Sequence, residues 1–190
     1  YLSKALGRTR RVHVYTPPGY EKTSTRYPVL YLLHGNGDND AAWSGHGRAN
    51  VILDNLIAAG KAKPMVIVMT DGHAVPVGAQ DKDPQLRFRD NMLAFGRDLV
   101  DDVLPLVEGL YRIDGKPQSR AIAGLSMGGG QTLYVGLNHA DKFGWVAAMS
   151  AAPPGVEDVG ALGDAAGLNK KLRWLWVGCG KDDFLIERVK

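Results

Sequence analysis

The sequence contains little cysteine, no long hydrophobic run and almost no excess of charge of either sign. Its single cysteine, Cys179, excludes an internal disulfide and argues against a zinc cluster. No apolar stretch approaches the length that a transmembrane helix needs, so no membrane partner is expected. The net charge is +3, from 23 Lys and Arg against 20 Asp and Glu, and the basic runs at 8–11 and 170–171 are short. We expect no nucleic-acid partner, because such partners need larger basic clusters.

What is present is an ordinary globular composition, 45% hydrophobic and 23% charged, in a chain of 190 residues that suits one domain. Short apolar runs alternate with helical patterns. The predicted strands are 11–16, 29–33, 65–69, 121–123, 145–149 and 172–177, and the predicted helices are 50–59, 91–110 and one from 126. This alternation predicts an α/β fold, a mostly parallel sheet with helices on both faces. The ligand site of such a sheet lies at the carboxyl ends of the strands.

Two local features refine these elements. Pro105 lies inside the predicted helix 91–110 and predicts a kink or a restart there. Trp174 and Trp176 alternate on the last predicted strand, and we expect both side chains to lie in the core. The thiol of Cys179 follows that strand and is expected to be buried and inert.

The most informative segment is Gly124-Leu125-Ser126-Met127-Gly128, between a predicted buried strand and a predicted helix. A serine at such a strand-to-helix turn has a strained backbone and an exposed hydroxyl, and residues without Cβ fit the flanking positions. The positive end of the following helix points at the serine, where negative charge develops in acyl transfer. Ser126 is therefore a candidate nucleophile. The alternative is a glycine-rich helix entry with an incidental serine.

A second loop at the same edge of the sheet has the sequence His-Gly-Asn-Gly over residues 34–37. Such a loop supplies one backbone N–H of an oxyanion hole, and Met127, just after the serine, supplies the other. We predict Asn36 as the donor from the loop, with Gly37 as the alternative. His34 is predicted to shape the loop rather than to act as the catalytic base.

A carboxylate is expected in the loop after the last predicted strand, where Asp182 and Asp183 lie. A carboxylate placed there can orient a histidine and stabilise its imidazolium form. The serine precedes this loop, with an intervening strand, which is the order of a serine-acid-histidine triad. The alternative is a solvated turn whose aspartate caps a helix.

Taken together, these segments resemble the esterase D-like branch of the α/β-hydrolases, and within it the feruloyl and acetylxylan esterases of carbohydrate esterase family 1. The resemblance is carried by residues 31–35, 47–52, 54–57, 121–130, 150–153 and 179–183. It implies one α/β-hydrolase domain over 1–190, in which Ser126 is the nucleophile and Asp183 the acid, with Asp182 as the alternative. It also implies a secreted or periplasmic enzyme without metal or cofactor. Its expected substrate is a small ester or a feruloylated or acetylated polysaccharide such as xylan.

Contacts with the substrate are expected from the loops at this edge. His34 and Gly35, with Trp43 in the same loop, are predicted to contribute to the substrate pocket. The loop 72–88 carries Pro84 and Phe88 and is predicted to shape an apolar pocket for the acyl group. Trp43 fits equally well a residue that packs a helix.

The catalytic histidine that the resemblance implies would follow Asp183 after one further strand. The 5 histidines all precede that residue: His13, His34, His46, His73 and His139. We therefore expect the chain to be incomplete at its C-terminus, without the last strand, the histidine loop and the final helix. His73 and His46 are the alternatives for an unusual base, because a serine without a base is a weak nucleophile.

Two other functions remain open at this point. An S-formylglutathione hydrolase shares the same branch of the superfamily. A non-catalytic carbohydrate-binding protein on a hydrolase fold would explain the lack of a histidine after the acid. The segment Gly47-Arg48-Ala49-Asn50 favours the esters of plant polysaccharides, by resemblance.

Overall fold

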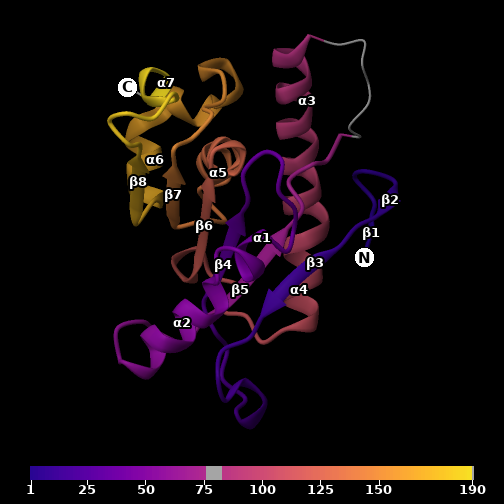
Figure 1. Cartoon of the computed structure of the whole chain (residues 1–190), viewed down its shortest axis with the longest axis vertical. Helices are drawn as coiled ribbons and strands as arrows, with labels where there is room; N and C mark the ends of the chain where they lie inside the picture. The colour runs from indigo at the N-terminus through magenta and orange to yellow at the C-terminus, as the bar shows by residue number, and fades with distance from the viewer. Residues whose placement is uncertain (76–82, 190) are drawn as a thin grey trace.

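The computed structural model describes residues 1–75 and 83–189, and its main sheet has the strand order β3-β5-β4-β6-β7-β8 (Figure 1). The first of these strands is antiparallel to its neighbour and the others are parallel. Their bounds are β3 Val12–Tyr15, β4 Val29–Leu33, β5 Val66–Thr70, β6 Arg120–Leu125, β7 Trp145–Met149 and β8 Trp174–Gly178. A separate antiparallel pair is formed by β1 (Leu2–Ser3) and β2 (Arg8–Thr9). The predicted α/β fold with a mostly parallel sheet is confirmed.

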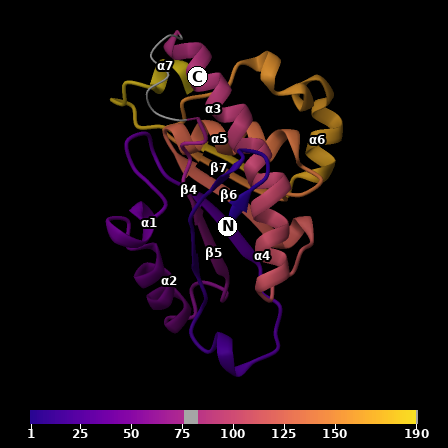
Figure 2. The same ribbon diagram turned by 90° about the vertical axis from the view of Figure 1, so that its right-hand side faces the viewer.

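Helices cover both faces of this sheet, as Figure 2 shows, with α1 and α2 on one side and α3, α4 and α6 on the other. The α-helices are α1 Ala42–Gly45, α2 Ala49–Ala58, α3 Pro84–Arg97, α4 Leu104–Leu110, α5 Met127–Asn138, α6 Ala165–Lys171 and α7 Ile186–Val189. The 3₁₀ turns are Tyr20–Lys22, Pro117–Ser119, Val156–Asp158 and Gly160–Asp164. Among the described residues no helix is long and apolar enough to cross a membrane.

The strand β4 shows why both faces are apolar. Tyr31 and Leu33 belong to the larger core, which includes Phe95 of α3. Leu32 belongs to a second core with Leu53 of α2. Because successive side chains of a strand point to opposite faces, a strand between two helical layers needs an unbroken apolar run.

The long helical region differs from its prediction at both its start and its middle. It begins at Pro84, before the predicted residue 91, because Asp83 caps it: Oδ1 accepts a hydrogen bond from Gln85 N–H at 2.8 Å. A π-helical segment, Asp98–Val103, separates α3 from α4. The helical backbone runs on through Pro105 without a break, so the expected restart is not seen; the irregularity is the π-helical segment that ends two residues before the proline.

The last strand, β8, contradicts two expectations. Trp174 and Trp176 are 48% and 42% exposed rather than buried, and their rings stack with centroids 6.4 Å apart. Leu175 and Val177, which point to the opposite face, are also exposed. β8 is the edge strand of the described sheet, and the described residues leave both of its faces partly open. Cys179 follows it and is half-buried, so the expected buried thiol is also wrong.

Candidate active site

Ser126 lies in the sharp turn between β6 and α5 with a backbone φ of 56° and ψ of −112°. A positive φ is uncommon for a residue other than glycine and marks local backbone strain. Three backbone hydrogen bonds hold the turn: Ser126 N–H donates to Met149 O at 2.9 Å, and Ser126 O accepts from Gly130 and Ala152, both at 3.0 Å. The strained conformation is therefore fixed from both sides by the sheet and the helix.

The glycines on either side of Ser126 are required by close approach of the backbone. A Cβ at Gly124 would lie 2.3 Å from Gly128 O, and a Cβ at Gly128 would lie 2.6 Å from both His34 O and Leu33 O. These atoms belong to the main chain and cannot move aside by a rotamer change. The turn, the start of α5 and the loop after β4 are thus packed without room for a methyl group.

We expect Gly124→Ala to lower the free energy of unfolding by about 3 kcal/mol, because overpacking costs roughly 1–3 kcal/mol and here the clash is with backbone. Urea unfolding monitored by tryptophan fluorescence measures this change. Gly109→Ala is the matched control: it lies in α4 with nothing within 4 Å of its added Cβ. That control should be neutral or slightly stabilising. Equal midpoints for the two variants would contradict the packing argument.

The loop after β4 brings a second set of backbone donors beside Ser126. His34 O accepts a hydrogen bond from Gly128 N–H at 3.1 Å, which ties the loop to the first turn of α5. Met127 is the first residue of α5, so its N–H has no acceptor within the helix. Within residues 1–75 and 83–189 the N–H of Asn36 donates no hydrogen bond. Both N–H groups are therefore available to a ligand.

A cavity of about 940 Å³ joins these groups. Its lining includes Asn36, Gly37, Ser126, Met127, Phe88 and Phe184. Pro84, Leu185 and Ala152 add apolar wall, and the exposed residues Arg87 and Arg188 also line the cavity. The predicted nucleophile and the predicted oxyanion donors therefore face one common space, together with part of the predicted acyl-pocket loop. Residues 76–82 of that loop lie outside the described residues.

Three residues predicted for the pocket lie elsewhere. Trp43 packs in α1 against the core around Leu32 and Leu53 and is not part of the cavity lining. His34 and Gly35 are buried beneath the cavity and do not line it. The helix-packing role for Trp43 is the one that the structure supports, because its loop folds into a helix whose apolar side faces the sheet.

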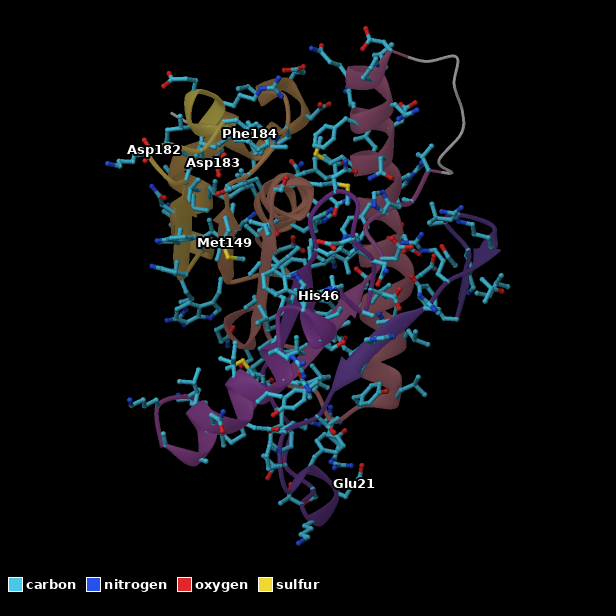
Figure 3. The ribbon with its side chains drawn as sticks, viewed as in Figure 1. Glu21, His46, Met149, Asp182, Asp183 and Phe184 are labelled. Carbon is cyan, nitrogen blue, oxygen red and sulfur yellow. The ribbon has the colours of Figure 1, made fainter. Side chains whose placement is uncertain are left out.

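Both ring nitrogens of His34 are engaged. Nδ1 lies 2.8 Å from Gly35 O, and Nε2 accepts a hydrogen bond from Gly72 N–H at 2.7 Å. The bond from Gly72 N–H makes Nε2 an acceptor, which assigns the Nδ1 position as the donor to Gly35 O and leaves no free lone pair for a substrate. His73 lines the cavity, with its ring centroid 5.5 Å from that of His34. His46 ends α1 and lies apart from the loop that carries Asp183 (Figure 3).

Burial lowers the pKa of His73 below its usual value of 6.5 against the opposite effect of the Asp71 charge, and His34 and Arg10 nearby lower it further. The folded protein then binds this proton less readily than the unfolded chain, so part of the stability is lost as pH falls through about 6.5. We expect the free energy of unfolding to fall between about pH 7.5 and pH 5, and to fall less in His73→Gln. Urea midpoints over this range measure both slopes. Equal slopes would contradict the assignment.

The two candidate acids lie in the loop after β8, beside Phe184 (Figure 3). Asp183 is half-buried, and its Oδ1 accepts a hydrogen bond from Leu185 N–H at 2.8 Å. The side chain of Asp182 is 88% exposed. Phe184 and Leu185 line the cavity, whereas Asp183 does not. Asp183 therefore lies directly before two cavity-lining residues, and its carboxylate is hydrogen-bonded within its own turn.

Two polar residues near the site were missed by the sequence analysis. Asn91 of α3 and Gln131 of α5 are buried, and both donate to Gly72 O. The only local signal was a polar amide on the apolar side of each predicted helix. Such a signal does not identify the hydrogen-bond partner, Gly72, which lies after β5.

A family model described as "Putative esterase" matches residues 3–183. The endo-1,4-β-xylanase/feruloyl esterase of Xylanibacter ruminicola is 33% identical over 189 residues, 95% of this chain. A solved ferulic acid esterase is 31% identical with a TM-score of 0.79; the match covers 99% of this chain and 79% of that one. The CE1 ferulic acid esterase of the anaerobic fungus Anaeromyces mucronatus is 32% identical with a TM-score of 0.73 over 83% of this chain and 60% of that one.

The extent of these matches differs between the relatives. The chain spans only 24% of the length of the Xylanibacter ruminicola protein. The family model, by contrast, covers the main sheet from β3 to β8 and both predicted oxyanion segments. The strand order, the turn at Ser126 and the loop after β4 all lie inside the matched region. The chain therefore belongs to this esterase family and has the α/β-hydrolase fold.

Proposed function

We propose that this chain hydrolyses carboxylic esters through an acyl-enzyme formed on Ser126. The observation that carries the proposal is the meeting of three groups in one cavity: the strained Ser126 and the N–H groups of Met127 and Asn36. Backbone N–H groups that are fixed before the substrate arrives stabilise the oxyanion without reorganisation.

In the proposed reaction, Ser126 Oγ attacks the ester carbonyl carbon, and its proton passes to a histidine held by Asp183. The carbonyl oxygen becomes an oxyanion that accepts hydrogen bonds from the two backbone donors. Collapse of this intermediate releases the alcohol, which takes the proton from the histidine. Water then attacks the acyl-enzyme by the same route. Within the described residues no histidine is bonded to Asp183, and the proposed reaction requires one in the functioning enzyme.

For the substrate, we propose ferulate or a related aromatic acyl group esterified to a polysaccharide such as xylan. The cavity wall has two aromatic side chains, Phe88 and Phe184, and the latter is 89% exposed. Exposed aromatic rings suit an aromatic acyl group because their faces and edges pack against it. The names of the relatives point to the same substrate class. Because xylan is an extracellular polymer, we also propose that the protein is secreted.

The test measures the hydrolysis of methyl ferulate and of a feruloylated xylo-oligosaccharide from the ferulate that is released. The rates are compared with those for 4-nitrophenyl acetate and S-formylglutathione. The proposal expects kcat/KM to be highest for the feruloylated oligosaccharide. Preference for S-formylglutathione would overturn the substrate assignment but keep the serine esterase. Binding of xylan without turnover of any ester would overturn the esterase itself in favour of a carbohydrate-binding protein.

A further inference from the structure

Gly72, two residues after β5, is held at both of its backbone polar groups by buried side chains. Its N–H donates to His34 Nε2 at 2.7 Å. Its C=O accepts from Asn91 Nδ2 at 2.9 Å and from Gln131 Nε2 at 2.8 Å. The three side chains come from the loop after β4, from α3 and from α5, and each is buried. One residue thus links three separate elements around the cavity.

The bond from Gly72 has a consequence for the neighbouring oxyanion loop. Because His34 Nε2 accepts this bond, the ring proton is on Nδ1 and is donated to Gly35 O at 2.8 Å. The carbonyl of Gly35 and the N–H of Asn36 belong to the same trans peptide and point in opposite directions. Fixing the carbonyl therefore also fixes the direction of the Asn36 N–H.

We propose that Gln131 and Asn91 are positioning residues for the oxyanion donor Asn36, acting through Gly72 and His34. The inference rests on the proposed function, since it concerns the same oxyanion hole. The amides hold Gly72, Gly72 holds the ring of His34 in one tautomer, and that ring holds the peptide whose N–H faces the cavity. No side chain in this relay other than Asn91 lines the cavity itself.

Two further contacts tie the relay to the second donor, Met127. Asn91 Nδ2 lies 3.9 Å from Met127 Sδ. A Cβ at Gly72 would lie 2.8 Å from Met127 Cε and 2.9 Å from Gln131 Oε1. The absence of a side chain at Gly72 thus allows the loop to approach the start of α5 closely. The residues around Gly72 therefore contact both the loop that carries the Asn36 N–H and the side chain of Met127.

Gln131 itself is not explained by packing alone. Its Oε1 is buried without a hydrogen-bond partner among the described residues, while its Nε2 bonds Gly72 O. A buried acceptor without a partner lowers stability relative to an apolar side chain of similar size. The hydrogen bond from its amide to Gly72 O therefore accounts for a glutamine at this position better than packing does.

The test compares Gln131→Met with the wild-type protein. We expect kcat for 4-nitrophenyl acetate to fall about tenfold or more with KM nearly unchanged, since loss of a whole oxyanion donor costs roughly 10²–10³ in kcat. Affinity for phenylboronic acid, which forms a tetrahedral adduct on a serine, should weaken by a similar factor. A role in folding alone would lower the unfolding midpoint and leave both quantities unchanged in the folded protein.

A second variant keeps the inference testable if Gln131→Met does not fold. In Gln131→Glu a protonated carboxyl still donates to Gly72 O, and an ionised one does not. We expect kcat near the wild-type value at low pH and a new loss of kcat as pH rises, with KM little changed. The matched control is Asn138→Asp: Asn138 is on the same helix and donates its Nδ2–H to Asp158 O at 2.9 Å. It should retain the wild-type pH profile.

The outcomes separate this inference from the proposed function. If Ser126→Ala is inactive while Gln131→Met keeps wild-type kcat and boronate affinity, the relay is overturned and the esterase assignment remains. A pH profile of kcat for Gln131→Glu that is indistinguishable from that of Asn138→Asp would likewise overturn the relay and leave the esterase assignment in place. If Ser126→Ala retains activity, the proposed function fails, and the relay fails with it.

Discussion

Ser126→Ala is expected, on the proposed mechanism, to abolish ester turnover, with kcat lower by about a millionfold, the order found when a serine nucleophile is removed from a hydrolase. The structure gives two reasons to expect a loss of chemistry and not of fold. The hydroxyl makes no capping hydrogen bond to α5, so its removal leaves the helix start intact. The three backbone bonds that hold the turn do not involve the side chain. Initial rates with 4-nitrophenyl acetate and labelling by a fluorophosphonate probe measure the effect.

The matched control is Ser150→Ala. Ser150 also has a positive φ, of 40°, and directly follows β7 at the same edge of the sheet. It is not part of the cavity lining. The same substitution on the same kind of backbone should therefore leave kcat within about twofold, as expected away from the reacting atoms. Labelling that persists in Ser126→Ala, or that is lost only in Ser150→Ala, would move the nucleophile away from Ser126.

The sheet was predictable because its central strands are apolar on both faces. The predicted strands 29–33 and 145–149 agree residue for residue with β4 and β7. Each is a continuous apolar run that ends at a polar residue, His34 or Ser150, which leaves little choice for its boundaries. The turn at Ser126 was predictable for a related reason, since the glycines that permit it, Gly124 and Gly128, each lie two residues from the serine.

What could not be predicted depends on contacts between distant residues. Gln131 and Gly72 are 59 positions apart, and Asn91 and Gly72 are 19 apart, so no local pattern pairs them. Trp174 and Trp176 show the same limit for burial. Their alternation predicts a strand, but burial requires another element packed on each face, and the sequence of the strand does not contain that information. Trp43 has an aromatic side chain that suits either a pocket or a core, and only the fold of α1 decides between them.

On the proposed mechanism, Asp183→Asn is expected to lower kcat by about 10⁴-fold with little change in KM, because an amide cannot hold the histidine that this mechanism requires in its tautomer or stabilise its charged form. The local structure should tolerate the change. Asp183 Oδ1 accepts a hydrogen bond from Leu185 N–H at 2.8 Å, and the amide oxygen of asparagine can accept the same bond. The loss would therefore report the missing charge and not a disordered loop. Initial rates for methyl ferulate, with thermal unfolding as a check of the fold, measure it.

Asp182→Asn provides the control that decides between the two neighbouring acids. Its side chain is 88% exposed and lies 4.0 Å from Lys181 Nζ, an ion pair in solvent worth little. Asp183, by contrast, is half-buried and directly precedes Phe184 and Leu185, which line the cavity with Ser126. We therefore expect near wild-type kcat for Asp182→Asn. A large loss in Asp182→Asn with none in Asp183→Asn would assign the acid to Asp182. If neither variant loses kcat, the acid of the triad comes from another loop. The mechanism needs a carboxylate to orient the histidine, and neither Asp182 nor Asp183 would then supply it.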